Sequence, residues 1–137
     1  LHDALPIYDG ILGVRGKEHP LSAYLKAGVP VALATDDLGI SRSEMTQEYA
    51  KAVKDHGLDY RQLKRMARNS LEHSFVGGAS FWKDARRFVP VAVCQSSLQS
   101  ATPAAACQRY LDGNARAKLQ FGLEKAFAQF EKNCCVR

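Results

Sequence analysis

The chain has 137 residues, of which 46% are hydrophobic and 24% charged, with 19 Lys and Arg against 14 Asp and Glu. This balance is typical of one soluble globular domain and excludes collagen-like, coiled-coil and wholly disordered chains. No apolar run approaches the roughly 18–20 residues that a membrane span needs. The net charge of +5 is spread along the chain, without the interleaved aromatic residues that stack on single strands. We therefore expect neither a membrane nor a nucleic-acid partner.

The first predicted helix begins at Pro20 and ends at Gly28, since proline suits the first turn of a helix and glycine its left-handed end. The run Val29–Thr35 follows. Its continuous apolarity indicates a strand that is buried on both faces, as in parallel sheets covered by helices. The first ten residues carry no clear period, so this strand is expected without a partner in the chain.

Two further helices are predicted after the strand. The first has capping-box spacing at Ser41 and Glu44 and ends at Gly57. Its apolar stripe consists of Met45, Tyr49, Ala52 and Val53. The second begins with Asp59–Gln62 and ends at the glycine pair 77–78. Its buried side consists of Leu63, Met66, Ala67, Ser70, Leu71 and Phe75.

The last third of the chain is predicted to be mostly helical. The stretch Phe88–Cys94 favours a strand that Pro90 interrupts, and small residues form a linker over Gln95–Thr102. A long helical pattern begins at Pro103 and is weakened at Gly113. One side of its final part is apolar and carries Leu119, Leu123, Ala126, Phe127 and Phe130.

The four cysteines leave two alternatives open. They stand at Cys94, Cys107, Cys134 and Cys135, without a CxxC pair, so a structural zinc site is not expected. Ordinary free thiols are the favoured interpretation. The alternative is a disulfide between Cys94 and Cys107 in an exported protein, which would favour a bacterial periplasm over the cytoplasm. The compartment stays open.

Asp36 and Asp37 are the strongest candidates for chemistry. They directly follow the predicted strand, at its carboxyl end. Two adjacent carboxylates in a partly desolvated place repel one another unless a cation or a substrate compensates. In α/β barrels the carboxyl ends of the strands form the catalytic face. The alternative from spacing alone is a turn or a helix cap.

Five short motifs together resemble the C-terminal part of the adenosine deaminase family, within the metal-dependent amidohydrolase superfamily. The resemblance covers about Ile11–Trp82 and continues more loosely over Lys118–Glu131. The motifs are His19-Pro20-Leu21, the run from Gly28 to Asp37, Glu48-Tyr49, Asn69-Ser70, and Phe75.

The resemblance implies a C-terminal fragment of a (β/α)8 barrel, an α/β fold, with Val29–Thr35 as its one clear strand. Asp36 matches the aspartate that ligates the catalytic zinc and contacts the metal-bound water, and Asp37 matches the one that hydrogen-bonds the purine at N7. The implied reaction is the hydrolysis of adenosine to inosine and ammonia by metal-activated hydroxide. Adenosine is therefore the expected substrate and Zn²⁺ the expected cofactor.

The other catalytic residues of the family have no match. Its remaining zinc ligands are a His-x-His pair and a later histidine, and none of the four histidines here stands in such a context. The chain begins with Leu1 rather than methionine. We expect an unmatched segment over 1–10, a partial barrel domain with trailing helices over 11–137, and a missing N-terminal part. Residues 1–137 alone are expected to be inactive.

The other polar residues receive structural interpretations. His19 is expected at the surface or as a cap, and Glu44 and Glu48 are expected on a solvated face or in a local salt bridge. Asn69-Ser70 is expected as a packing or capping feature, and Trp82 in the core or as a surface anchor. Two functional alternatives remain: a non-enzymatic helical binding module, and a related amidohydrolase that acts on adenine or another purine amine.

Overall fold

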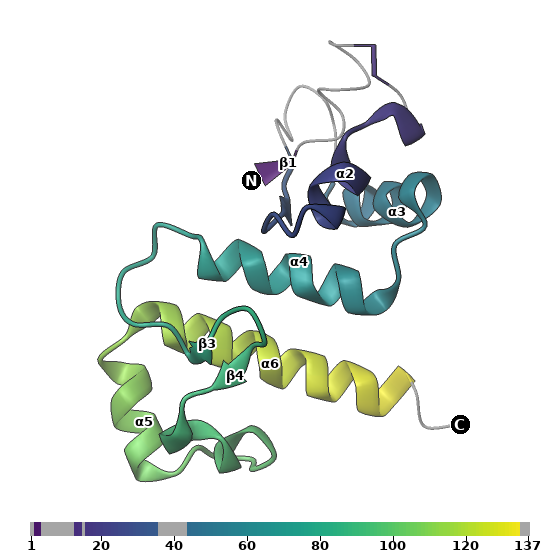
Figure 1. Cartoon of the computed structure of the whole chain (residues 1–137). Helices are drawn as coiled ribbons and strands as arrows, with labels where there is room; N and C mark the ends of the chain where they lie inside the picture. Colours follow the sequence, from purple (N-terminus) through teal and green to yellow (C-terminus); the bar gives the residue numbers. More distant parts are fainter. Residues whose placement is uncertain (1, 4–12, 15, 36–43, 135–137) are drawn as a thin grey trace. The chain divides into compact units, whose positions relative to one another are not determined.

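A computed structural model describes residues 2–3, 13–14, 16–35 and 44–134. The backbone groups into two compact units, Leu1–Ser70 and Leu71–Arg137, which are described separately. Both are mainly helical with a small sheet, so the predominance of helices is confirmed (Figure 1). Neither small sheet closes into a barrel, and the division of the chain at residue 10 stays a prediction. Among the described residues, no helix is both long and apolar enough to cross a membrane.

The first unit contains a short parallel sheet and the helices around it. Its elements are β1 (His2–Asp3), the 3-10 turn η1 (Gly16–Glu18), α2 (Leu21–Lys26), β2 (Ala32–Leu33), α3 (Met45–His56) and most of α4 (Tyr60–Glu72). β1 pairs with β2 in parallel, with His2 opposite Ala32 and Asp3 opposite Leu33. The strand predicted over Val29–Thr35 is confirmed but is shorter. The expectation that it has no partner was wrong, because a two-residue strand is too short to show a period.

Local signals place the ends of these helices well. Gly28 and Gly57 have φ of +72° and +65° and end α2 and α3, as predicted. Asp59 and Gln62 start α4, as predicted, and the structure adds that they cap it reciprocally. The Gln62 N–H donates to Asp59 Oδ1 at 2.8 Å, and the Asp59 N–H donates to Gln62 Oε1 at 2.9 Å. The start of α3 was misplaced. Glu44 itself is its N-cap, and Gln47 rather than Ser41 is the other member of the capping box.

The predicted buried faces of α3 and α4 need correction. Met45 and Val53 are 43% and 44% exposed, and Glu48 is fully buried with Ala52. The predicted buried face consisted of apolar residues only and therefore did not include Glu48. α4 ends at Glu72, not at the glycine pair 77–78, and Phe75 beyond it is fully exposed.

The second unit packs a hairpin against two helices. Its elements are β3 (Trp82–Asp84), β4 (Val89–Pro90), the 3-10 turns η2 (Ala92–Cys94) and η3 (Ser96–Leu98), α5 (Ala105–Asp112) and α6 (Ala115–Cys134). β3 and β4 are antiparallel, and Pro90 closes the short β4. α6 turns a different face inward from the predicted one, since Leu119 and Phe130 are half exposed while Ala117 and Gln120 are buried.

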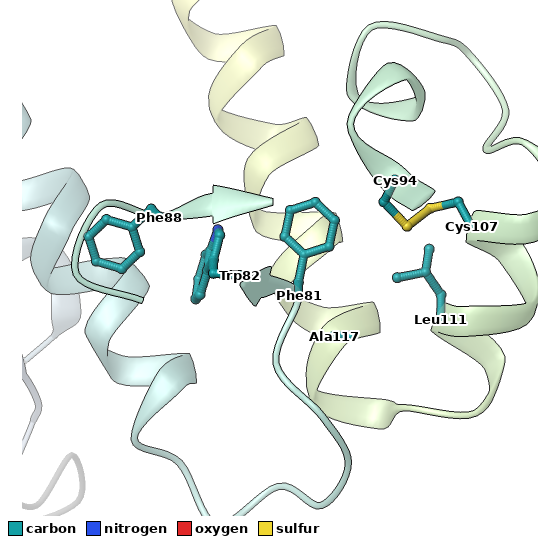
Figure 2. Close-up of a cluster of buried hydrophobic side chains, with 7 residues drawn as sticks. All are labelled: Phe81, Trp82, Phe88, Cys94, Cys107, Leu111 and Ala117. Carbon is teal, nitrogen blue, oxygen red and sulfur yellow. A yellow bond between two sulfur atoms is a disulfide. The ribbon is translucent and has the colours of Figure 1, made fainter. Parts of the chain in front are cut away.

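Aromatic rings and a disulfide form the core of the second unit. Trp82 is 3% exposed, which confirms its core role, and its ring meets Phe88 edge to face. Figure 2 shows Phe81 between Trp82 and the disulfide that joins Cys94 to Cys107. The favoured expectation of free thiols was therefore wrong for these two residues, because spacing cannot show which cysteines meet. Cys134 is free and exposed.

Candidate functional site

The predicted site follows β2, but its two aspartates lie outside the described residues. The structure describes the chain up to Thr35 and again from Glu44, so it does not test the roles of Asp36 and Asp37. It does describe the strand that leads into them and the helices around that strand.

The strand before the aspartates is buried on both sides, as its sequence predicts. Val31, Ala32 and Leu33 are 0%, 4% and 3% exposed. The apolar cluster around them consists of Leu21, Val31, Leu33, Ala52, Leu58 and Met66. These residues come from α2, α3, α4 and the loop before α4, so three helices cover a strand of two residues. The residues that lead towards the two aspartates are therefore enclosed by apolar side chains.

Asn69 connects α4 to this strand by a specific hydrogen bond. Its side chain is 8% exposed, and Nδ2 donates to the Val31 carbonyl at 2.9 Å. The expectation that Asn69 is a packing feature is confirmed. Sequence reasoning missed the contact across 38 residues, because nothing near Asn69 in the chain indicates which carbonyl it binds. Ser70, by contrast, bonds within its own helix, to the Ala67 carbonyl at 2.8 Å.

The pair Glu48-Tyr49 lies at the inner side of α3. Both carboxylate oxygens of Glu48 are inaccessible to solvent, so the expectation of a solvated face was wrong for Glu48. It holds for Glu44, which is exposed at the start of the helix. Burial raises the pKa of the Tyr49 phenol above its ordinary value of 10.0, because the phenolate would lose its hydration. Tyr49 therefore remains neutral throughout the physiological range.

Two histidines meet at the start of α2. His19 is 4% exposed, and its Nδ1 accepts a hydrogen bond from the Leu21 N–H at 3.1 Å. His19 thus bonds the first residue of α2, although the N-cap residue itself is Pro20, and the surface alternative was wrong. The His19 and His56 rings pack edge to face with centroids 5.7 Å apart, and Ser22 Oγ lies 3.2 Å from His56 Nδ1. These contacts join the start of α2 to the end of α3.

Two open clefts border this junction. The larger, about 410 Å³, is lined by Lys17, Ser22, Lys54, Asp55, His56 and Gly57. A second cleft of about 260 Å³ shares Ser22, His56 and Gly57 with it. Lys54 and His56 belong to the last turn of α3, where cations complement the helix dipole. The Lys54 charge beside the cleft is thus explained by its stabilising effect on α3.

The described residues do not hold a metal by themselves. Nowhere in the described ranges do three or more His, Cys, Asp or Glu side chains gather as they would around an ion. Catalytic zinc requires three protein ligands and an open position. The described part of the chain therefore does not contain a zinc site by itself, and the ligand role of Asp36 stays a prediction.

Comparisons with known proteins bear on the region around β2. Residues 14–80 match the adenosine deaminase family model, close to the range over which the resemblance was expected. The chain is 41% identical over 59 residues to an aminodeoxyfutalosine deaminase of Streptomyces coelicolor, a match that covers 43% of this chain and 15% of that protein. It is 35% identical over 60 residues to an adenosine deaminase of Shewanella loihica, covering 44% and 18%.

An adenine deaminase of Agrobacterium fabrum is 37% identical over 62 residues, covering 45% of this chain and 19% of that protein. The matched segment thus spans less than a fifth of each of these three relatives. No solved structure matches the chain. The family match ends at residue 80, so the looser likeness expected over Lys118–Glu131 stays a prediction.

Proposed function

Residues 14–80 of this chain belong to the adenosine deaminase family, and from this premise we propose that the whole protein carrying them is a zinc-dependent adenosine deaminase. The reaction exchanges one bond for another at C6 of the purine. Water adds its oxygen to C6, the C6–N bond breaks, and the products are inosine and ammonia. The family match is the observation that carries the proposal. The buried strand before Asp36 supports it.

Asp36 and Asp37 are the residues that this chain would contribute to the reaction. Both are proposed as parts of the site on the resemblance of the Thr35-Asp36-Asp37 motif to that of the family. Asp36 would ligate zinc and orient the attacking water, and Asp37 would hydrogen-bond the purine at N7. Zinc, when bound, lowers the pKa of a coordinated water to about 7. The buried residues Val31, Ala32 and Leu33 lead into this motif, which supports its place in the proposal.

The remaining ligands would come from outside this chain. The sequence contains no His-x-His, and a zinc site needs at least three protein ligands. We therefore propose that residues 1–137 are inactive alone and need the rest of the barrel. The substrate could differ within the family, since relatives of similar identity are named for aminodeoxyfutalosine and for adenine.

The test measures ammonia released by the purified whole protein loaded with zinc, from adenosine, adenine and aminodeoxyfutalosine in parallel. We expect release from adenosine, and loss of that release in Asp36→Ala. Release from another of the three substrates alone would correct the substrate and keep the reaction class. A zinc-loaded, folded protein that releases ammonia from none of the three would overturn the proposal and favour a binding module.

A further inference from the structure

Asn69 and the Val31 carbonyl form a side-chain bridge in the core of the first unit. The donor is on α4 and the acceptor is on the residue directly before β2, and their nitrogen and oxygen are 2.9 Å apart. Asn69 is 8% exposed and Val31 fully buried. Water has little access to this bond, so loss of the amide donor would leave the buried carbonyl with one hydrogen bond fewer.

A hydrogen bond restrains displacement along a strand more specifically than apolar packing does. Val31 and Leu33 pack with Met66 of α4, but contacts between apolar side chains have no preferred direction along a strand. Within the described part of the chain, the strand pairs with β1 at Ala32 and Leu33. A hydrogen bond is directional, and it is lost when the carbonyl moves by a fraction of a residue.

We infer that Asn69 is a positioning residue, which fixes β2 along its axis and thereby places the strand end that leads into Asp36 and Asp37. The inference rests on the proposed function for the roles of the two aspartates. It goes beyond that function because it assigns the placement of the motif to a residue that touches neither metal nor substrate. Displacements of about 1 Å in an active site cost on the order of 100-fold in rate.

The first experiment uses hydrogen exchange on the 137-residue chain. In Asn69→Asp at pH 7 the introduced carboxylate cannot donate to the Val31 carbonyl. We expect protection of the Ala32 and Leu33 amides to fall about tenfold or more, while amides of α5 and α6 keep theirs. The matched control is Ser70→Ala, which removes the neighbouring hydroxyl and its bond to the Ala67 carbonyl but leaves the bridge intact.

Lowering the pH supplies a rescue within the same variant. Once protonated, the introduced carboxyl donates a hydrogen bond again, so protection of β2 in Asn69→Asp returns as the pH falls. Asn69→Leu has a similar size and no donor at any pH, and therefore shows no recovery. Equal protection of β2 in the unsubstituted chain and both variants at pH 7 would overturn the inference.

The second experiment measures kcat of the whole protein well below its unfolding temperature, where all variants are folded. If the bond has only a structural role, its loss lowers Tm and leaves kcat unchanged. A positioning role predicts a fall in kcat of about 10- to 100-fold in Asn69→Asp and no change in Ser70→Ala.

A kcat within twofold of the unsubstituted enzyme in Asn69→Asp would overturn the inference and leave the proposed function standing. If the unsubstituted whole protein is itself inactive, the proposed function fails instead. The exchange experiment then still decides whether Asn69 positions the strand.

Discussion

Cys94 and Cys107 are joined by a disulfide, and neither side chain retains exposed surface. The bond links η2 to α5 across 13 positions of the sequence and belongs to the same buried cluster as Phe81 and Trp82. A link of this length removes much of the freedom that the intervening linker would have in the unfolded chain.

Removing the disulfide is expected to destabilise the second unit. Cys94→Ser together with Cys107→Ser should lower its free energy of unfolding by about 3 kcal/mol, from loop closure alone. Denaturant unfolding measures the loss, and Cys134→Ser, at an exposed free thiol, is the control. Thiol titration of the native chain should detect at most two of the four cysteines. Four reactive thiols in the folded protein would contradict the bond.

A buried glutamine organises the same unit. Gln120 is fully buried, its Oε1 accepts the Phe81 N–H at 2.7 Å, and its Nε2 donates to Glu72 Oε2 at 2.8 Å. Gln120→Leu leaves both partners without these bonds and should cost about 2–3 kcal/mol of unfolding free energy. Gln129→Leu, at an exposed position of the same helix, should change it by less than about 0.5 kcal/mol. Equal effects of the two substitutions would show that the network contributes nothing.

Two glycines of the second unit should respond in opposite directions to alanine. Gly78 has φ +100°, and a Cβ there would lie 2.9 Å from the Asn114 Cα, so Gly78→Ala should destabilise by about 2–4 kcal/mol. Gly122 is inside α6 with open space around it, so Gly122→Ala should stabilise by about 0.5–1 kcal/mol. Thermal unfolding of both variants checks the signs. A Gly78→Ala protein as stable as the unsubstituted chain would refute the close approach.

Substitutions of Asp36 and Asp37 in the whole protein are expected to have different effects on zinc binding and on turnover. Asp36→Ala should reduce deamination to background and strongly weaken zinc binding, because a ligand is lost. Asp37→Ala should retain zinc and lower turnover of adenosine by about 10- to 100-fold, the value of a hydrogen bond with a charged group. Metal analysis of both purified variants decides between the roles. Equal zinc retention in the two variants would contradict the assignment of a ligand role to Asp36.

The 137-residue chain should not deaminate adenosine by itself. The sequence supplies one expected zinc ligand, and one carboxylate does not hold the ion against water. We expect residues 1–137 with added zinc to convert adenosine to inosine no faster than buffer, with the whole protein as the positive control. Turnover by the 137-residue chain that disappears in Asp36→Ala would show that it needs no other part of the barrel.

Local chemistry made part of this protein predictable from sequence. The capping pair Asp59 and Gln62 and the left-handed glycines Gly28 and Gly57 act within one helical turn, so their residues alone place the helix ends. The apolar run before Asp36 needed no partner to be recognised as a buried strand. The motifs between residues 14 and 80 were likewise sufficient to indicate the family.

Contacts between distant residues were decided only by the tertiary structure. Glu48 is polar, so its pattern predicted a solvated face, yet the fold buries it. Gln120 meets Phe81 across 39 residues, and Asn69 meets Val31 across 38. The sequence spacing of Cys94 and Cys107 is compatible both with a disulfide and with two free thiols, and the structure shows the disulfide. Periodicity and capping report interactions over about four residues, whereas these contacts depend on how the helices pack, which local sequence does not encode.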